Sequence, residues 1–558
     1  MTKIRCPACE GYRINEEARE IKLGGKHIGE LANLTIKELI GHIQGLSGSA
    51  VVSPQGKAMI EQILETLNHM VDVGLSYLHL NRTIPTLSGG ELQRLSLMMH
   101  LDAGLDSLIY VLDEPSMSLH EREKNSLVKI LKNLKDLGNT LIIVEHDKRF
   151  IEIADQVIDI GPGAGVNGGN IVYQGSVEDL KKVKISHTGR FLAGDMELIH
   201  KTNEKKNQSN EQKYLTIKNV NTNNLKDITV KIPLGMMVGI AGVSGSGKSS
   251  LISETLVPLI KPYFKRGSSR KKIRNGEEED SGESLHEYSG KIDGWEYLDN
   301  IVVVNQKPIS RVRTSTPCTY IGIWDKIRRV FAKTEEAKKR NYKAGHFSYN
   351  SEKGRCPVCK GQGEQDLQIS FLSELTLPCK ECKGTRYLPE ILEIKYQGNT
   401  IYDVLNMTVS EALEHFKSHN SISKVLGVLN DVGMGYITLG QPSPTLSGGE
   451  AQRVKLAREL GKIKRGNTLY ILDEPTVGLS FYDAVKLMEL LNKLVNEGNS
   501  IIIIEHDPDI LRACDYIIEL GPEGGPEGGE VIADGTPLEI INNSLSNTGL
   551  YLRVDKKR

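Results

Sequence analysis

The sequence predicts an α/β fold of parallel sheets, arranged as one and a half tandem copies of one domain with helical insertions. Three features of the 558 residues predict this fold. A glycine-rich turn, Gly242 to Ser249, separates an apolar run from a helix-like run. Four short motifs occur twice, in the same order and at one constant offset. Six of the eight cysteines lie in C-x-x-C pairs, which predicts an inserted metal module.

Length and composition are those of an ordinary globular protein with more than one core. With 558 residues, 39% of them hydrophobic and 25% charged, the chain is expected to form three or four domains. No apolar run approaches ~20 residues, and Met1 to Cys6 lacks the apolar core of a signal peptide. We therefore expect a cytoplasmic protein with no membrane partner. The net charge of −1 means that a nucleic acid would have to be bound by local basic patches.

The repeated motifs show that most of one domain is duplicated. The pairs are Leu87–Arg94 with Leu446–Arg453, Tyr110–Pro115 with Tyr470–Pro475, Ile142–Asp147 with Ile502–Asp507, and Ile160–Gly163 with Leu520–Glu523, at an offset of 359 or 360 residues. Four ordered motifs at one offset indicate duplication rather than coincidence. Projected backwards, the offset places the first copy of the glycine-rich turn before Met1. We therefore expect the chain to begin partway through its first repeat.

The repeat predicts six segments along the chain. Residues 1–45 form a partial cysteine and signature region of repeat one, 46–195 the C-terminal part of domain one, 196–213 a polar linker, 214–264 the start of domain two, 265–440 the second signature domain with its zinc module at 354–388, and 441–558 the C-terminal part of domain two. Within the fifth segment, residues 265–290 carry a basic and then an acidic run and are expected to form a mobile insertion.

The turn from Gly242 to Ser249 has the G-x-x-x-x-G-K-S pattern of a phosphate-binding loop, in the strand–loop–helix context that this loop requires. Its glycines allow backbone N–H groups to converge on a phosphate, and the helix start adds partial positive charge. Lys248 is expected to neutralise the β- and γ-phosphates, and the Ser249 hydroxyl to ligate Mg²⁺. The expected nucleotide contacts are Gly242, Ser244, Gly245, Ser246, Gly247, Lys248, Ser249 and Ser250.

Asp473 and Glu474 end the apolar run Thr468–Leu472, where an α/β sheet places its active site. We expect Asp473 to hold the Mg²⁺ shell and Glu474 to orient or deprotonate the attacking water. His506 ends another β-branched run and is placed to contact the γ-phosphate. An acidic pair at a strand end by itself is more simply a helix cap. Its position after a phosphate loop favours the catalytic interpretation.

Two Leu-Ser-Gly-Gly-Glu segments, each about 20 residues before an Asp-Glu-Pro, resemble the signature of the ABC ATPase superfamily. The resemblance implies that a nucleotide is held between the phosphate loop of one domain and the signature of the other. Repeat two would supply Lys248, Ser249, Gln306, Asp473, Glu474 and His506, with Glu474, His506 and Gln306 as the catalytic group, and repeat one would supply Ser88, Gly89 and Gly90. The opposite site has a signature at Ser447–Gly449 and carboxylates at Asp113 and Glu114, but no phosphate loop within this sequence.

The pairs Cys356/Cys359 and Cys379/Cys382 stand 19 residues apart. This C-x₂-C-x₁₉-C-x₂-C spacing predicts a closed tetrahedral Zn²⁺ site, which would be structural; four free structural thiols are the alternative. Two further cysteines, Cys6 and Cys9, match the second pair, and their partners would lie before Met1, so we do not expect them to bind zinc in this chain alone. The remaining two cysteines, at 318 and 514, are expected to be packing residues.

A longer set of motifs resembles the UvrA family, the damage-recognition subunits of bacterial nucleotide excision repair. These motifs are Gln306–Ile309, Pro317–Gly322, Phe347–Asn350, Gly354–Cys359, Gly435–Gln441 and Leu446–Ala457. The match runs through almost the whole chain and corresponds to roughly the C-terminal 60% of a full member. The resemblance implies a dimer that uses ATP, Mg²⁺ and Zn²⁺, scans double-stranded DNA for damage and loads UvrB. It implies an ATPase that is not itself a nuclease, and a place in the SOS response.

The resemblance also assigns DNA contacts, with some departures. Arg311 and Tyr320 fall on family positions, whereas the next arginine, Arg313, is displaced by one place. The stretch from Lys326 to Lys343 has eight basic and two acidic residues, which suits a phosphate backbone or, equally, a solvated helix face. The family's UvrB-binding region would lie upstream of Met1, so UvrB binding is not carried over.

Three functions are compatible with these features. The first is an ATP-dependent sensor of damaged DNA. The second is a catalytically weak remnant or paralogue that binds DNA through its zinc module, because a first repeat without its phosphate-loop strand has an open sheet edge. The third, a translation-factor or transporter ATPase, is disfavoured by the inserted zinc module.

Overall fold

The computed structural model describes residues 6–47, 53–84, 87, 89–102, 106–116, 119–163, 168–195, 212–264, 290–305, 309–310, 312–367, 375–461 and 466–553. Three residues expected in the site or on DNA, Ser88, Gln306 and Arg311, lie outside these ranges. So do the expected linker up to residue 211 and the charged insertion from 265 to 289.

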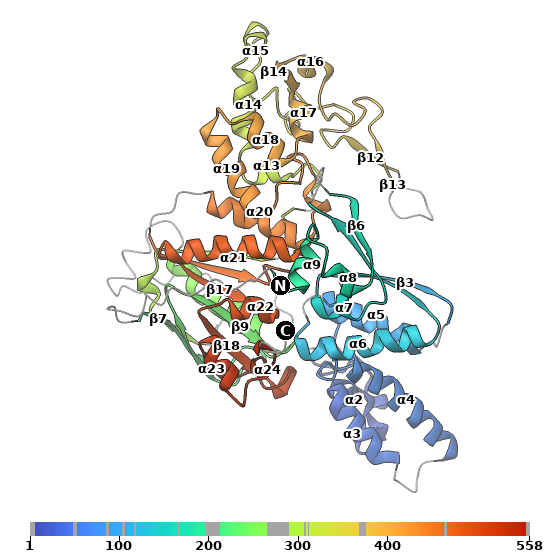
Figure 1. Cartoon of the computed structure of the whole chain (residues 1–558). Helices are drawn as coiled ribbons and strands as arrows, with labels where there is room; N and C mark the ends of the chain where they lie inside the picture. The colour runs from blue at the N-terminus through green and yellow to red at the C-terminus, as the bar shows by residue number, and fades with distance from the viewer. Residues whose placement is uncertain are drawn as a thin grey trace.

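The second repeat is built on one six-stranded sheet with the order β11-β16-β17-β9-β18-β19 (Figure 1). The strands are β11 (Asn300–Val304), β16 (Thr468–Asp473), β17 (Ser500–Ile504), β9 (Met237–Gly242), β18 (Tyr516–Gly521) and β19 (Glu530–Gly535). All neighbours are parallel except β18 and β19. Every residue of β9 is buried, as expected of an apolar strand covered on both faces.

One face of this sheet is covered by a small antiparallel sheet and a composite helix. The antiparallel sheet has the order β10-β7-β8, from Lys291–Asp293, Tyr214–Val220 and Ile228–Pro233. The helix runs as α10 (Lys248–Leu251), a π-turn (Ile252–Leu256) and α11 (Val257–Ile260), where the sequence predicted a helix-like run. The Thr255 hydroxyl donates to the Ser250 carbonyl at 2.7 Å inside this wider turn.

The other face is covered by helices from the C-terminal part of the second repeat. These are α20 (Gly448–Leu460), α21 (Phe481–Asn496) and α22 (Pro508–Arg512), followed along the chain by α23 (Pro537–Asn542) and α24 (Gly549–Leu552). Leu487 and Leu491 of α21 share a core cluster with Ile501 and Ile503 of β17. The apolar spacing of α21 along one helix face accounts for this packing.

In the described residues from 53 to 195, the first repeat contains two separate two-stranded sheets. One pairs β3 (Ile109–Asp113) with β4 (Thr140–Val144) in parallel, and the other pairs β5 (Val157–Gly161) with β6 (Asn170–Gly175) in antiparallel orientation. The associated helices are α5 (Gly89–Asp102), α6 (Glu121–Asp136), α7 (Lys148–Glu152), α8 (Val177–Leu180) and α9 (His187–Leu192). A helical lobe of α2 (Ile28–Asn33), α3 (Ile36–Ser47) and α4 (Pro54–Asp72) precedes them.

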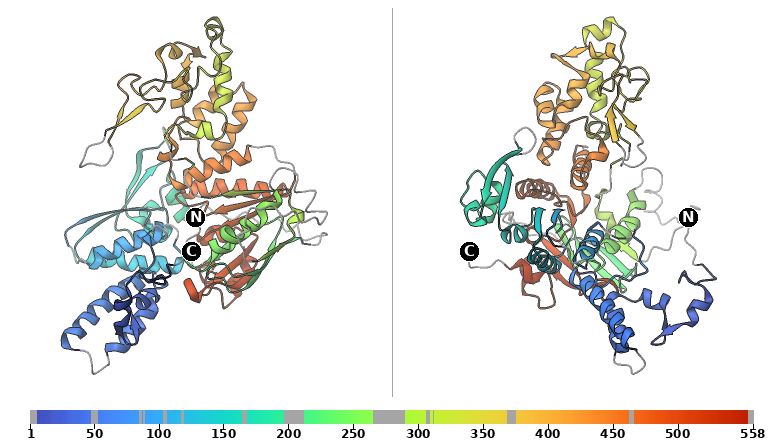
Figure 2. Two further views of the ribbon diagram at one scale, coloured as in Figure 1. Left: turned by 180° about the vertical axis from the view of Figure 1, so that it is seen from behind. Right: turned by 90° about the vertical axis from the view of Figure 1, so that its right-hand side faces the viewer.

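The segment between β11 and α20 forms a second helical lobe. It comprises α13 (Pro317–Tyr320), α14 (Trp324–Ala332), α15 (Glu335–Lys339), α16 (Pro389–Leu392), α17 (Ile401–Asn406), α18 (Val409–His415) and α19 (Asn420–Asp431), and the hairpin β12 (Glu364–Leu367) and β13 (Leu375–Pro378). Its core is aromatic, through Phe331, Phe347, Tyr349, Tyr387 and Phe416. The two helical lobes lie at opposite ends of the molecule, with the sheets between them (Figures 1 and 2). Among the described helices, none is both long and apolar enough to cross a membrane.

Candidate nucleotide site

The phosphate loop follows β9 directly and owes its shape to three glycines in the left-handed region. Gly242, Gly245 and Gly247 have φ values of 135°, 74° and 108°. A Cβ atom on Gly242 would lie 2.1 Å from the carbonyl oxygen of Leu520, so no other residue fits there. The turn that the glycine spacing predicted is therefore present, at the carboxyl end of a central strand.

Lys248 is buried beneath this loop. Its Nζ donates to the carbonyl oxygens of Gly242 and Val243, both at 2.8 Å. Burial lowers the pKa of Lys248 to about 8, although Glu123 and Glu474 act in the opposite direction. Within the described residues, the ammonium is hydrogen-bonded to carbonyl oxygens and forms no ion pair with a carboxylate, which leaves its charge available to a phosphate.

Two serines of the loop differ in their surroundings. The Ser246 hydroxyl is buried and has no hydrogen-bond partner among the residues described, whereas Ser249 is exposed at the start of α10. A buried hydroxyl without a hydrogen-bond partner costs free energy, unless a ligand atom supplies that partner. The loop is thus chemically suited to an anion, and the accessible Ser249 hydroxyl is suited to a cation bound to it.

The carboxylates that end β16 lie on the same side of the sheet as the phosphate loop. Burial and, to a smaller extent, the neighbouring Glu474 raise the pKa of Asp473 to about 6, against the opposing effect of Lys248. Glu474 has a φ of 45° and its backbone N–H donates to the carbonyl of Ile504 at 2.9 Å. This hydrogen bond holds the end of β16 to β17, and the positive φ of Glu474 ends the extended conformation of the strand.

His506, at the end of β17, faces Glu474. Its Nε2 lies 3.5 Å from Glu474 Oε1. Burial lowers the pKa of His506, and the nearby Lys248 adds to this effect, so the ring is neutral at physiological pH. His506 Nδ1 is buried without a partner in the described part of the chain. The structure therefore brings together Lys248, Asp473, Glu474 and His506, which the motifs had selected separately.

Two residues that support this site were not predicted. Glu505 is buried behind it and accepts bonds from the backbone N–H groups of Thr476 at 3.2 Å and His506 at 2.9 Å. Burial raises the pKa of Glu505 to about 7. Gln452 of α20 donates to the carbonyl of Asp473 at 2.6 Å. The repeated Glu-His pair, Glu145-His146 and Glu505-His506, was the signal in the sequence for the first of these.

The first repeat reaches the phosphate loop through Tyr77, which the motifs also missed. The Tyr77 hydroxyl bonds to Glu91 Oε1 at 2.5 Å and lies 3.5 Å from Ser244 Oγ. Glu91 belongs to the first turn of α5, which begins at Gly89 and Gly90. The contact therefore brings the start of the signature helix beside the phosphate loop. Burial raises the pKa of Tyr77 above its usual range.

A fourth unpredicted residue, Asn224, braces the other side of the loop. Its Nδ2 donates to the carbonyl oxygens of Gly245 at 3.0 Å and Gly525 at 2.9 Å. The segment around Gly525 follows β18, so Asn224 joins the phosphate loop to the next strand end. No local motif marks an asparagine for this role.

The first repeat carries the counterpart carboxylate and histidine. Glu114 has a φ of 44°, and its Oε1 lies 3.7 Å from His146 Nε2, as Glu474 does near His506. Burial raises the pKa of Glu114, and His146 opposes the rise. Ser447 caps α20 through Glu450 and opens the second signature helix. In the part of the chain that the structure describes, no phosphate loop faces this second set.

Four cysteines form a compact thiol cluster at the base of the β12–β13 hairpin. The Sγ atoms of Cys356, Cys359, Cys379 and Cys382 all lie within 4.8 Å of one another. Two pairs are 3.6 Å and 4.0 Å apart, close to the ~3.8 Å that tetrahedral geometry sets for Zn–S bonds of about 2.3 Å. Burial opposes ionisation of Cys379, but backbone N–H groups of Cys382 and Glu381 outweigh it and lower the pKa to about 7. The donor set fits Zn²⁺.

The other cysteines occupy different surroundings. Cys6 is exposed and Cys9 is partly exposed, and neither belongs to a group of three or more metal-binding side chains within the described ranges. Cys318 and Cys514 are buried among apolar residues. Burial raises the pKa of both thiols, to about 12 in the case of Cys318. These two lie where packing residues are expected.

The basic stretch from Lys326 to Lys343 is partly engaged within the protein. Arg328 contacts Asp325, and Arg340 bonds to Glu336 at 2.9 Å and to Glu393 at 2.5 Å. Another candidate DNA contact, Tyr320, has the guanidinium of Arg458 stacked 4.5 Å from its ring centre. These contacts favour a structural role for part of this charge.

The chain is similar to bacterial proteins over almost its whole length. No family model matches the chain. The UvrABC system protein A of Thermus thermophilus is 45% identical over 549 residues, which is 98% of this chain and 56% of that protein. The Aquifex aeolicus protein of the same name is 46% identical over 552 residues, 98% of this chain and 58% of that protein.

A solved structure agrees with these sequences. The crystal structure of UvrA2 from Deinococcus radiodurans matches with a TM-score of 0.88 and 40% identity, covering 98% of this chain and 66% of that one. The chain thus spans 56–58% of the length of these two curated relatives. The phosphate loop, the strand-end carboxylates, the two signature helices and the four-cysteine module accord with this likeness, and the chain belongs to the UvrA family of ABC ATPases.

Proposed function

We propose that this protein binds and hydrolyses ATP at one composite site and uses that reaction to bind damaged double-stranded DNA in nucleotide excision repair. The observation that carries the proposal is the contact of Tyr77 with Ser244, 3.5 Å apart. This contact between the first repeat and the phosphate loop of the second supports a site that combines the signature helix of the first repeat with Lys248 and Glu474 of the second. A site assembled from both repeats suits an ATPase that transmits a change between its two halves.

Each residue has a distinct task in this proposal. Lys248 and the loop N–H groups bind the phosphates, and a phosphate oxygen gives the buried Ser246 hydroxyl the hydrogen-bond partner that it lacks. Asp473 and Ser249 would hold Mg²⁺, which neutralises charge on the phosphates when bound. Glu474 orients or deprotonates the attacking water, and His506 contacts the terminal phosphate. We extend the proposal to Gly242, Gly245, Gly247, Ser250, Gly89 and Gly90 as loop and signature contacts, and to Ser88 and Gln306 beyond the described ranges.

The four-cysteine module is proposed to be a structural zinc site that shapes a DNA-binding surface. A closed set of four thiolates leaves no open position for catalysis. We propose a homodimer as the DNA-bound form and the cytoplasm as its location.

The proposal is tested by steady-state ATP hydrolysis of Glu474→Gln against wild type, with and without UV-irradiated duplex DNA. Loss of the base is expected to lower kcat by about 10²–10⁴-fold. Glu114→Gln is the matched control, because Glu114 has the same backbone conformation and histidine neighbour but no described phosphate loop. Equal rates for wild type and Glu474→Gln, or equal losses in the two variants, would contradict the assignment.

A second candidate function is DNA binding through the zinc module with little hydrolysis of ATP. The divided sheet of the first repeat favours this candidate. DNA affinity that survives Glu474→Gln, in a wild-type protein with no measurable hydrolysis, would support this candidate.

A further inference from the structure

A small cavity at the boundary between the repeats is lined by the segments that follow β4 and β17. Its volume is about 110 Å³. Its acidic and histidine side chains come in equivalent pairs from the two repeats: Glu114 with Glu474, Glu145 with Glu505, His146 with His506, and Asp147 with Asp507. Among the described residues that line this cavity, Lys124 is the only lysine or arginine. One cation from the first repeat therefore meets carboxylates of both repeats.

The two aspartates of this set hold the segments that carry the histidines. Asp147 caps α7 by accepting a hydrogen bond from the Arg149 N–H at 2.9 Å, and Asp507 caps α22 by accepting one from the Asp509 N–H at 2.7 Å. A capping side chain ties the residue before a helix to the first turn of that helix. Because His506 directly precedes Asp507, the cap of α22 also holds the backbone that carries the His506 ring.

Lys124, near the start of α6, forms a buried ion pair with Asp147. The Lys124 Nζ lies 2.5 Å from Asp147 Oδ2 and 2.6 Å from Glu121 Oε1. A buried ammonium is stable only where carboxylates or hydrogen bonds compensate its charge. Burial opposes the charged form, but three carboxylates outweigh it and raise the pKa of Lys124 above its usual range: those of Asp147, Glu121 and Asp507. Lys124 is therefore a fixed positive charge in the wall of the cavity.

Asp507 depends on this charge from the other repeat. Burial and the neighbouring Asp509 raise the pKa of Asp507 to about 6, against the opposing charge of Lys124. The nearest arginine along the chain, Arg512, pairs with Asp509 at 2.5 Å instead. Lys124, which lines the same cavity, is thus the basic side chain that compensates the charge of Asp507.

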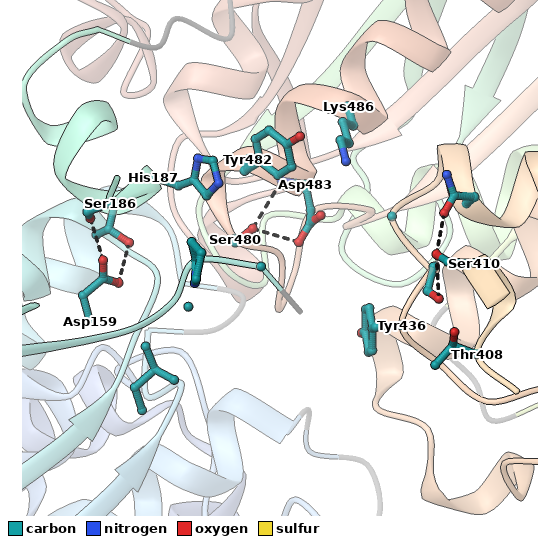
Figure 3. Close-up of a pocket in the computed structure, with 18 residues that line it drawn as sticks. Asp159, Ser186, His187, Thr408, Ser410, Tyr436, Ser480, Tyr482, Asp483 and Lys486 are labelled. Atoms are coloured by element: carbon teal, nitrogen blue, oxygen red, sulfur yellow. Dashed lines mark hydrogen bonds between the residues drawn. The ribbon is translucent and has the colours of Figure 1, made fainter. Parts of the chain in front are cut away.

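The second repeat supplies no equivalent cation to this cavity within the described part of the chain. At an offset of 360 residues, Lys124 of α6 corresponds to Ala484 of α21. The first lysine of α21, Lys486, lies 4.2 Å from the ring centre of Tyr482, and both side chains line a different cavity (Figure 3). The compensation is therefore one-sided, because a lysine of the first repeat serves the aspartates of both.

We propose that Lys124 is a positioning residue for the composite ATP site and acts on His506 of the second repeat through the carboxylate of Asp507. The ammonium compensates the buried charge of Asp507, so that α22 stays capped and His506 stays beside Glu474. Because the same ammonium binds Asp147, the two histidine segments share one counter-ion. This inference rests on the proposed function, since the site that Lys124 positions is the proposed ATP site.

The test uses a charge-balanced variant, because loss of a buried cation by itself destabilises a protein. Lys124→Met/Asp147→Asn removes one positive and one negative charge, and Glu121 keeps its contact with Arg149. We expect kcat for ATP hydrolysis to fall about tenfold and KM for ATP to change less than about threefold, because the phosphate loop is untouched. Adding Asp507→Asn is expected to restore kcat to within about threefold of wild type, because asparagine caps a helix without a charge to compensate.

The matched control removes an exposed ion pair formed by the same helix. Lys135 and Asp155 pair at 2.7 Å, and Lys135→Met/Asp155→Asn should leave kcat and Tm unchanged. An unchanged kcat in Lys124→Met/Asp147→Asn would overturn the proposal. So would a loss of kcat that Asp507→Asn does not restore, or a lower Tm without a separation of kcat from KM, because a merely structural role gives these results.

Amide hydrogen exchange separates this inference from the proposed function, because it requires no hydrolysis. In Lys124→Met/Asp147→Asn we expect the amides of α22 to exchange about tenfold faster, and the added Asp507→Asn to slow them again. Unchanged exchange in α22 would contradict the role of Lys124. In a wild-type protein without Glu474-dependent hydrolysis, the proposed function fails, whereas the exchange result still decides whether Lys124 holds the histidine segment.

Discussion

At the scale of single residues, burial sets the chemistry of the candidate ATP site. Asp473 and Lys248 are both removed from water, and each has its pKa moved toward neutrality, to about 6 and about 8. Ionisable groups with shifted pKa values concentrate at functional sites, because burial disfavours the charged form of each group until a ligand of opposite charge binds. A bound cation and a bound phosphate would move both pKa values back toward their usual ranges.

These pKa values predict a bell-shaped pH profile for ATP hydrolysis. Asp473 must be ionised to hold a cation, so kcat/KM should rise as pH increases through about 6. Lys248 must be protonated to bind phosphate, so kcat/KM should fall as pH increases through about 8. Measuring kcat/KM rather than kcat reports the ionisation of the free protein. A profile that is flat from about pH 5.5 to about pH 8.5 would contradict both assignments.

At the scale of elements, the β12–β13 hairpin depends on its thiol cluster. The hairpin has four paired positions, and both of its ends lead into C-x-x-C turns. A hairpin of this size is marginally stable by itself, so a metal that ties the two turns together would contribute much of its order. The spacing of the cysteines in the sequence already predicted this arrangement.

Replacing one ligand tests the zinc module. Cys379→Ser is expected to lower bound zinc from about one ion per chain to well below that, and to reduce affinity for UV-irradiated DNA about tenfold or more. Elemental analysis and fluorescence anisotropy measure the two effects. Cys6→Ser is the control, because Cys6 is exposed and outside the cluster. Zinc content that is unchanged in Cys379→Ser would exclude the four-thiolate site.

At the scale of the whole molecule, the two repeats carry equivalent tyrosines, but only one of these tyrosines contacts a phosphate loop. Tyr77 touches the phosphate loop at Ser244, whereas its counterpart Tyr436 faces a cavity. Aromatic stacking adds to the interface, with Phe191 of α9 on Phe481 of α21 at 3.6 Å between ring centres. The asymmetry gives this chain one candidate composite ATP site of its own.

The contact between Tyr77 and Ser244 is expected to control ATP hydrolysis. Tyr77→Ala removes the hydroxyl that links Glu91 to Ser244 and should lower kcat/KM for ATP roughly tenfold, because one hydrogen-bonded contact is worth about 1–2 kcal/mol. Tyr436→Ala is the matched variant and should leave ATP hydrolysis unchanged, because no phosphate loop faces it among the described residues. Equal effects of the two substitutions on kcat/KM would show that the contact is not specific to the site.

The sequence by itself determined the parts of the site that depend on a few adjacent residues. A phosphate loop needs glycines at fixed steps and a lysine at its end, and a zinc module needs thiols at fixed steps, so both are visible without a structure. The strand-end carboxylates Asp473 and Glu474 were predictable for the same reason, because parallel strands present their carboxyl ends at one edge. Part of the basic stretch after Lys326 was ambiguous, since ion pairs with Glu336 and Glu393 depend on packing.

Only the tertiary structure decided which distant residues meet. Tyr77 and Ser244 are 167 residues apart, and Asn224 and Gly525 are 301 apart, so no local pattern connects them. The exposure of Ile142, on β4 of the first repeat, is equally a tertiary property. The same apolar pattern is buried at Ile502 and exposed at Ile142, because burial depends on whether another element lies on the sheet. Residue type sets what a position prefers, and the neighbours that folding brings to it decide whether that preference is met.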